Sequence, residues 1–305
     1  IAAKFIEILE ELQLPPGVVN YLTGSGGEIG DPIIDHPRTR FIAFTGSRDV
    51  GLRIFERAAK VHPGQVWLKR TILEMGGKDC IVVTDKCGDL NAAAEGVVAA
   101  AFGFQGQKCS ACSRLIVDEK VHDALVEKVV ERASKLVVGN TTTPENFSMG
   151  AVIDKSAYEK ILGYVETGKK EGKMVLGGSK VPAGGYYIPP TIFINIKPDD
   201  RLAQEEIFGP VLAVIKGRGL DNLLEIANGT EYGLTGAIYS HDRMELERAR
   251  QEFHVGNLYF NRKCTGALVD VQPFGGFNMS GTDSKAGGRD YLLLFMQGKS
   301  IAERL

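Results

Sequence analysis

Short apolar runs typical of strands alternate with helical patterns along most of the chain, and this alternation constrains the fold more than any other feature. Parallel strands need a crossover between them, usually a helix, so repeated strand–turn–helix units favour a parallel sheet. The sequence therefore predicts an α/β fold of doubly wound parallel-sheet layers, with ligands at the carboxyl ends of the strands. The expected strands are 18–22, 40–44, a run from 81 onward, 114–118, 191–194, 211–216, 235–239, 255–260 and 298–303. The expected helices are 1–12, 48–60, 90–103, 120–136, 220–228, 242–252 and 287–296.

Composition and charge exclude several classes of protein. The 305 residues carry 36 Lys and Arg against 38 Asp and Glu, a formal net charge of -2, so neither nucleic acid nor a membrane is an expected partner. No apolar stretch approaches the ~20 residues that span a bilayer, and no signal peptide is visible. Five cysteines without framework spacing fit a reducing compartment, so we expect a cytoplasmic protein. Ile1 opens directly on a helical pattern, so we expect that an N-terminal portion is absent.

Cys109 lies in the polar segment Phe104-Gln105-Gly106-Gln107-Lys108-Cys109-Ser110-Ala111, between an alanine-rich helix and an apolar strand. A thiol on such a turn, with a lysine beside it, is expected to be accessible and to favour the nucleophilic thiolate. Cys80, inside an apolar run, is expected to be structural. The C-x-x-C spacing with Cys112 also fits zinc or a redox pair, but no second pair of ligands completes a zinc site, so no metal is expected.

Two segments in the first quarter of the chain carry further candidates. Glu74 precedes Gly76-Gly77, and its apolar flank could raise its pKa toward the range of a general base; the alternative is an acid at a strand end that faces solvent. Gly46 and Ser47 lie where a strand meets a helix N-terminus, which suits either a phosphate or an ordinary N-cap.

The second half of the chain adds three loops. In Glu205-Glu206-Ile207-Phe208-Gly209-Pro210, a carboxylate can accept both hydroxyls of a ribose with Phe208 against a flat ring, or the acids cap a turn. Gly266-Ala267 and Pro273-Phe274-Gly275-Gly276 expose backbone N–H groups that suit an anion. Neither G-x-G-x-x-G nor G-x-S-x-G is present, which argues against a standard Rossmann fingerprint and against a serine hydrolase.

Five of these segments, in this order, resemble motifs of the aldehyde dehydrogenase superfamily. They are Phe44-Thr45-Gly46-Ser47, Leu73-Glu74-Met75-Gly76-Gly77-Lys78, Gln105-Gly106-Gln107-Lys108-Cys109, Glu205 through Pro210 and Pro273-Phe274-Gly275-Gly276. The closer resemblance is to pyrroline-5-carboxylate (glutamate-semialdehyde) dehydrogenases. It rests on residues 107–114, on Asn261-Arg262 leading to Thr265-Gly266-Ala267, and on residues 280–285.

The resemblance implies a role for each candidate and a division of the chain. Cys109 is the nucleophile and Glu74 the base that activates the hydrolytic water. NAD is held by Gly46 and Ser47 at its pyrophosphate, by Glu206 at its nicotinamide ribose and by Phe208 at its ring, while Ser110, Gly266, Ala267 and Phe274 bind a small aldehyde that carries a carboxylate. Residues 1–75 would be the C-terminal part of an NAD-binding domain, 76–275 the catalytic domain, and 276–305 a C-terminal helix and the oligomerisation strand of a homo-oligomer.

The implied reaction is the oxidation of glutamate γ-semialdehyde to glutamate in proline catabolism. Cys109 attacks the aldehyde, hydride leaves to NAD+, and water activated by Glu74 hydrolyses the resulting thioester. A free thiol of pKa ~8.5 is only slightly ionised at pH ~7, so either the loop favours the anion or Glu74 takes the proton.

Some features depart from the family pattern. An oxyanion-hole asparagine and a lysine on the adenine ribose would both precede Ile1, so a polypeptide that begins there is expected to bind NAD poorly and to have little activity. Asp270 stands where a small residue is expected; it either faces the pocket, offset by Arg262 or Lys263, or points outward. The alternatives are a dehydrogenase of another small semialdehyde and an inactive fragment that acts as an assembly module.

Overall fold

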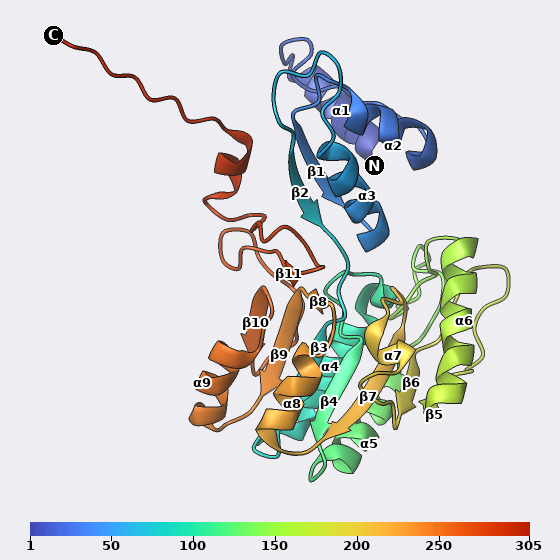
Figure 1. Cartoon of the computed structure of the whole chain (residues 1–305). Helices are drawn as coiled ribbons and strands as arrows, with labels where there is room; N and C mark the ends of the chain where they lie inside the picture. Colours follow the sequence, from blue (N-terminus) through green and yellow to red (C-terminus); the bar gives the residue numbers. More distant parts are fainter. The chain divides into compact units, whose positions relative to one another are not determined.

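The computed structural model describes residues 1–305, which form two compact units (Figure 1). The first unit comprises residues 1–42 and 52–71, and the second comprises residues 43–51 and 72–305. The three-part division at residues 75 and 275 stays a prediction.

The first unit contains α1 (Ala2–Glu11), α2 (Gly26–Asp35) and most of α3 (Arg48–Ala58). Arg53 and Arg57 of α3 pair with Asp31 and Asp35 of α2, which holds these two helices together. Strands β1 (Phe41–Thr45) and β2 (Arg70–Glu74) form a two-stranded sheet. The strand expected at 18–22 is absent because its apolar side chains are exposed and no strand lies beside it, and the glycines after it open helix α2 instead of a turn.

The second unit is built on a seven-stranded sheet with the order β10-β9-β3-β4-β7-β6-β5. Neighbouring strands are parallel except β5 and β6, which are antiparallel, so the predicted α/β fold with a parallel sheet is confirmed. A small antiparallel pair, β8 (Tyr232–Gly233) and β11 (Phe277–Asn278), lies outside this sheet. The seven strands are β3 (Cys80–Val83), β4 (Arg114–Asp118), β5 (Lys173–Leu176), β6 (Thr191–Ile194), β7 (Val211–Gly217), β9 (Thr235–Tyr239) and β10 (Asn257–Phe260).

Helices cover both faces of this sheet, as a doubly wound fold requires (Figure 1). Helices α4 (Leu90–Phe102) and α5 (His122–Ser134) cover one face, and α6 (Lys155–Glu171), α7 (Arg201–Gln204), α8 (Gly219–Asn228) and α9 (Arg243–Glu252) cover the other. Because successive side chains of a strand point to opposite faces, Ile81 joins the first core and Cys80 and Val82 the second. Each such fully buried aliphatic side chain contributes about 1.5–3 kcal/mol. Cys80 is confirmed as a buried structural residue.

Three parts of the chain differ from expectation. Helix α6, the longest, was not predicted from the sequence. The expected helix at 287–296 is only a short 3-10 turn over Tyr291–Phe295, and the possible strand at 298–303 is not formed, since its residues are exposed and pair with no strand. No helix of the chain combines the length and the apolar character that crossing a membrane would require.

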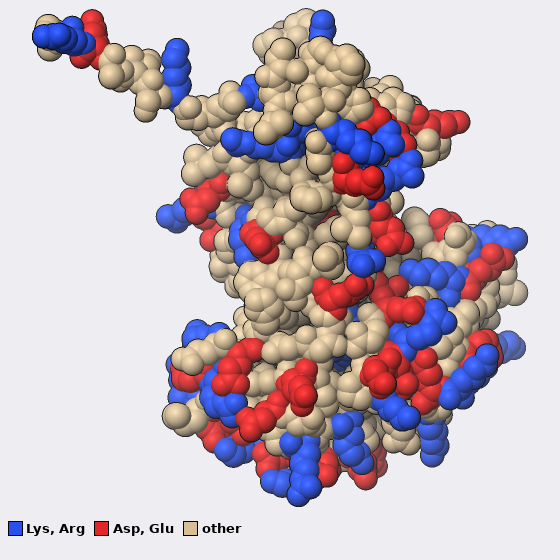
Figure 2. Space-filling model, viewed as in Figure 1, with Lys and Arg blue, Asp and Glu red and all other residues tan.

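Acidic and basic side chains are interspersed on the face of the molecule that Figure 2 shows. Some of the charged side chains of the chain form ion pairs within one helix, such as Arg248 with Glu252 on α9. No single-sign patch of the kind that binds a nucleic-acid backbone stands out in this view.

Candidate active site

Three predicted site segments lie at the amino ends of neighbouring strands. Gly76-Gly77 leads into β3, the Cys109 loop leads into β4, and Glu206 with Phe208 leads into β7. Strands β3, β4 and β7 are adjacent and parallel, so their amino ends meet at one edge of the sheet. These predicted site residues therefore lie at the opposite edge of the seven-stranded sheet from the carboxyl ends at which ligands were expected, whereas Glu74 ends β2 and Gly46 directly follows β1.

Gly76 and Gly77 allow the three segments to approach closely. A Cβ atom on Gly76 would lie 2.4 Å from Oε2 of Glu206, and one on Gly77 would lie 2.5 Å from the carbonyl oxygen of Cys109. No side chain fits at those distances, so only glycine lets the carboxylate and the cysteine backbone reach this turn. The N–H of Gly77 also donates to Oε1 of Glu206 at 3.0 Å.

The Cys109 loop follows α4 through a short 3-10 segment, Gly103–Gly106, in which Phe104 and Gln105 have positive φ angles of 56° and 59°. The N–H of Cys112 donates to Ala100 O at 3.1 Å, which returns the loop to the end of α4. The Cys109 thiol is half-buried. The predicted loop between a helix and a strand is thus confirmed.

The expectation that this loop favours the thiolate is wrong. Burial, followed by the nearby charges of Asp79, Glu206 and Glu74, raises the pKa of Cys109 to about 12. A thiol with such a pKa is protonated at neutral pH and needs a base to accept its proton. Of the two alternatives left open by the sequence, proton transfer to a base is the one that this environment favours.

Glu74 is buried at the end of β2 and does not face solvent. Burial raises its pKa to about 7, while a hydrogen bond from Ser284 Oγ at 3.4 Å and the charge of Lys285 lower it. Its second oxygen, Oε2, has no hydrogen-bond partner. A carboxylate that titrates near neutrality with a free oxygen has the properties of a general base.

Residues 280–285 complete the surroundings of Glu74. The N–H of Met75 donates to Ser280 O at 2.8 Å, and Leu73 exchanges two hydrogen bonds with Thr282. Lys285 Nζ donates to the carbonyl oxygens of Gly256 and Gly275, each at 2.6 Å. In the sequence these residues are recognisable only as a motif, whereas in the structure they surround Glu74.

Lys78 and Asp79 were also missed as parts of the site. Both are almost fully buried: burial lowers the pKa of Lys78 to about 7 and raises that of Asp79 to about 8. Asp79 accepts the N–H of Thr235 at 2.5 Å, and among the charges it has the largest effect on the pKa of Cys109. The available signal was a Lys-Asp pair directly before a fully apolar strand, where charged side chains are rare.

Arg114, at the start of β4, fixes this edge of the sheet. Its guanidinium is buried and donates to the carbonyl oxygens of Lys78, Ile226 and Ala227 at 2.8, 2.9 and 2.9 Å. The Lys78 bond joins the glycine turn to the strand that follows Cys109.

The predicted cofactor residues have distinct environments. Glu206 is mostly buried, which raises its pKa, with the bond from Gly77 N–H acting in the opposite direction. Phe208 is exposed and has a φ of 58°, a left-handed conformation that is strained for a bulky residue. Ser47 Oγ accepts the N–H of Val50 at 3.4 Å, so it acts as a cap of α3. The first N–H groups of a helix are not satisfied within the helix, so this cap does not preclude an anion.

The predicted substrate residues come from two loops that meet. Ser110 is buried, and its carbonyl oxygen accepts the thiol of Cys264 at 3.6 Å, which places the loop of Gly266 and Ala267 beside the cysteine loop. Phe274 is half-buried and exchanges two backbone hydrogen bonds with Ala286. Asp270 is exposed and accepts from Arg289 Nε at 3.4 Å, so it points outward and pairs with neither of the cations proposed from the sequence.

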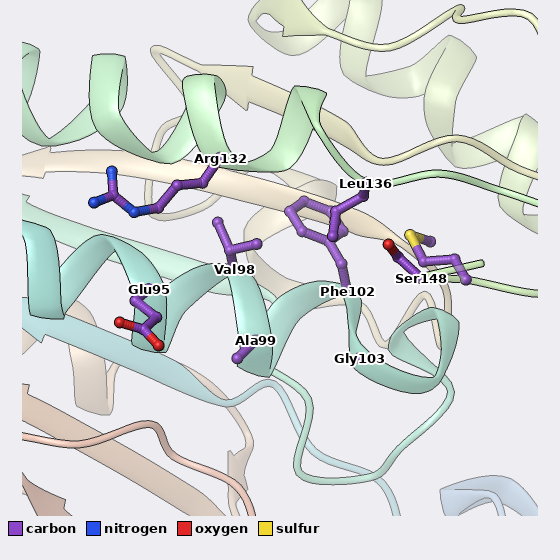
Figure 3. Close-up of a pocket in the computed structure, with 9 residues that line it drawn as sticks. Glu95, Val98, Ala99, Phe102, Gly103, Arg132, Leu136 and Ser148 are labelled. Carbon is purple, nitrogen blue, oxygen red and sulfur yellow. The ribbon is translucent and has the colours of Figure 1, made fainter. Parts of the chain in front are cut away.

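A cavity of about 380 Å³ lies elsewhere, between α4 and the end of α5 (Figure 3). Apolar side chains line most of it, with Glu95 and Arg132 at one end, and it contains none of the predicted site residues. No group of three or more His, Cys, Asp or Glu side chains is arranged to hold a metal ion.

Comparison with known proteins identifies similar sequences over almost the whole chain. The sequence pattern of the aldehyde dehydrogenase family matches residues 1–301. The 1-pyrroline-5-carboxylate dehydrogenase of Anoxybacillus flavithermus is 63% identical over 303 residues, which are 99% of this chain and 58% of that protein. The enzyme of the same name from Bacillus subtilis is 58% identical, with the same coverage of 99% and 58%. The chain thus spans about 58% of the length of these relatives.

Solved structures show the same likeness. The 1-pyrroline-5-carboxylate dehydrogenase from Thermus with bound NAD has a TM-score of 0.97 and 54% identity, covering 99% of this chain and 58% of that one. The betaine aldehyde dehydrogenase of Staphylococcus aureus in complex with NAD+ has a TM-score of 0.87 and 28% identity, covering 95% and 56%. The predicted fold is confirmed by these similarities.

Proposed function

Because the chain belongs to the aldehyde dehydrogenase family, we propose that it carries the catalytic thiol and base of a dehydrogenase that oxidises L-glutamate γ-semialdehyde to L-glutamate, with NAD as cofactor. The observation that carries the proposal is the convergence of Cys109, Glu74 and Glu206 around one glycine turn. The relatives named 1-pyrroline-5-carboxylate dehydrogenase support the substrate, and the NAD-bound Thermus enzyme supports the cofactor.

Glu74 has two proton transfers to perform in this reaction. It first accepts the proton of the Cys109 thiol, whose raised pKa prevents spontaneous ionisation at neutral pH. The thiolate then attacks the aldehyde carbon, and the N–H of the cysteine can donate to the oxygen that becomes negative. Glu74 then releases the thiol proton to solvent, which a pKa of about 7 allows near neutrality, and after oxidation it accepts a proton from the water that hydrolyses the thioester.

The residues around the thiol fit the proposed cofactor. Glu206 accepts one hydrogen bond from Gly77 N–H, so its carboxylate retains acceptor positions for ribose hydroxyls. Phe208 is an exposed aromatic side chain held in a strained conformation, as expected of a wall for a flat ring. Gly46 and Ser47 directly precede α3, and the N–H groups of the first turn of this helix support a phosphate site there. When bound, NAD supplies the acceptor for the hydride.

Ser110, Gly266, Ala267 and Phe274 are the proposed substrate residues. The contact between Cys264 and Ser110 supports a carboxylate site formed jointly by the two loops, next to the Cys109 thiol.

We also propose a homo-oligomer in the cytoplasm. Five free cysteines suit a reducing compartment, and Leu292, Leu293 and Met296 expose apolar surface near the C-terminus that a second copy could cover.

The decisive experiment measures NADH formation from glutamate γ-semialdehyde by the protein as expressed in its natural host, with Cys109→Ala as the control. We expect turnover that the substitution abolishes. The nearest alternative is the same chemistry on another small semialdehyde, and it is tested by comparing kcat/KM values. A higher kcat/KM for succinate semialdehyde than for glutamate γ-semialdehyde would refute the proposed substrate.

A further inference from the structure

Arg262 lies behind the loop that is proposed to bind the substrate carboxylate. Its Nη2 atom donates to two successive carbonyl oxygens, those of Thr265 at 3.1 Å and Gly266 at 3.4 Å. The guanidinium itself is fixed by the ring of Tyr259, whose centroid lies 4.7 Å away and which belongs to strand β10. The proposed function assigns no role to this arginine.

Because the peptide bond is planar, these contacts also fix the direction of the neighbouring N–H groups. In a trans peptide the C=O and the N–H point in opposite directions. The unit that carries Thr265 O also carries the N–H of Gly266, and the unit that carries Gly266 O also carries the N–H of Ala267. Because both carbonyls point at Arg262, both N–H groups point away from it.

Gly266 makes this arrangement possible. Two successive carbonyls can converge on one nitrogen only where the chain turns sharply between them, and Gly266 has a φ of 90°, which disfavours other residues. Successive N–H groups on the opposite side of such a turn form a concavity that binds anions. The N–H groups that face away from the guanidinium are the ones proposed to hold the carboxylate.

We propose that Arg262 is a positioning residue: it orients the Gly266 and Ala267 N–H groups toward the carboxylate of the aldehyde substrate without touching that carboxylate. This inference rests on the proposed function, because it requires an anionic aldehyde at that loop. It assigns the selectivity for a carboxylate-bearing substrate to a side chain on the far side of the peptide planes.

The test compares anionic with neutral aldehydes. In Arg262→Met we expect KM for glutamate γ-semialdehyde to rise at least about tenfold, because the loop loses a well-directed hydrogen bond from a backbone N–H to the charged carboxylate of the substrate. The kcat and KM for propionaldehyde, which has no carboxylate, should stay within about twofold of wild type. An equal loss with both aldehydes would overturn the proposal and indicate a general structural role.

Two further variants separate positioning from simple charge attraction. Arg289→Met removes one positive charge from the same region, at Asp270, and leaves the Thr265 and Gly266 carbonyls held; we expect wild-type kinetics with both aldehydes. Arg262→Lys keeps the charge but lacks the planar group that stacks on Tyr259. We therefore expect that lysine does not restore most of the wild-type selectivity for the carboxylate-bearing aldehyde. Full rescue by lysine, or an equal loss in Arg289→Met, would overturn the proposal in favour of charge attraction.

Failure of the proposed function gives a different pattern of results. If wild type prefers succinate semialdehyde, the substrate assignment fails, but that aldehyde is also anionic and the Arg262→Met comparison is made with it. If wild type shows no preference for carboxylate-bearing aldehydes over propionaldehyde, both the substrate assignment and the role of Arg262 are refuted.

Discussion

The hydrogen bond from Ser284 to Glu74 gives a quantitative prediction for the pH dependence of the reaction. Glu74 has a pKa of about 7, raised by burial and lowered in part by Ser284 Oγ, which donates to Oε1 at 3.4 Å. The substitution Ser284→Ala removes this donor and leaves burial unchanged. The pKa of Glu74 should therefore rise.

The size of the rise follows from the strength of the bond. Hydrogen bonds to charged groups are worth about 1.5–3 kcal/mol, and about 1.36 kcal/mol corresponds to one pKa unit. Because the contact is long, at 3.4 Å, the lower limit applies, and we expect a rise of about one unit. A base must be ionised to act, so activity is present above its pKa and is lost as the pH falls through it.

The assay is the pH profile of kcat for Ser284→Ala, with Ser284→Thr as a matched variant that keeps the hydroxyl. The acidic limb of the alanine variant should lie about one pH unit above that of wild type. At a pH below both limbs, the alanine variant should therefore be about tenfold slower than wild type, while the plateau at alkaline pH is unchanged. The threonine variant should retain the wild-type limb. An acidic limb that stays in place or moves to lower pH in Ser284→Ala would refute the reasoning.

Four further tests address separate parts of the structure. Replacing the Lys285 ammonium, as in Lys285→Met, removes a charge that lowers the pKa of Glu74, so the acidic limb should also move to higher pH; an unchanged limb would show that this charge does not act on the base. In Asp79→Asn the rate of Cys109 alkylation should begin to rise at lower pH than in wild type, because the charge that most raises the thiol pKa is gone. Asp85→Asn, which loses only an ion pair with Lys120, is the control. Cys109→Ala should abolish turnover while Cys112→Ala retains most of it, and equal losses would favour a redox pair. Arg114→Met should lower the free energy of unfolding in urea by about 3 kcal/mol or more, since three buried carbonyls lose their donor, whereas the exposed control Arg289→Met should change it by less than about 0.5 kcal/mol.

The sequence predicts best where local pattern and burial agree. Strands 114–118 and 235–239 match β4 and β9, because they are apolar on both sides and lie inside a parallel sheet. The apolar run at 18–22 has the composition of a strand but no strand beside it, so its side chains stay exposed. Helix α6 buries only Ile161 and Gly168, and its glycines and lysines weaken the pattern; the cap at Asp154 was the signal that could have revealed it.

The same contrast holds in the site. Cys109 and Glu74 could be singled out because each lies in a distinctive local segment. Their protonation could not be predicted, because it depends on residues that only the fold brings together. Ser284 is 210 positions from Glu74, and Asp79 acts on the thiol from the neighbouring strand. A lysine beside Cys109 in the sequence suggested a thiolate, but burial and three carboxylates outweigh it.

The hydrogen bonds between residues 73–75 and residues 280–282 also bear on the order in which the parts of the proposed site form. Glu74 and Cys109 leave the ribosome before the segment that contains Ser284 and Lys285. A chain stopped before Ser280 would carry the Cys109 sulfur without Ser284 and Lys285, so the adjusted proton acceptor arises only after residues 280–285 have been translated.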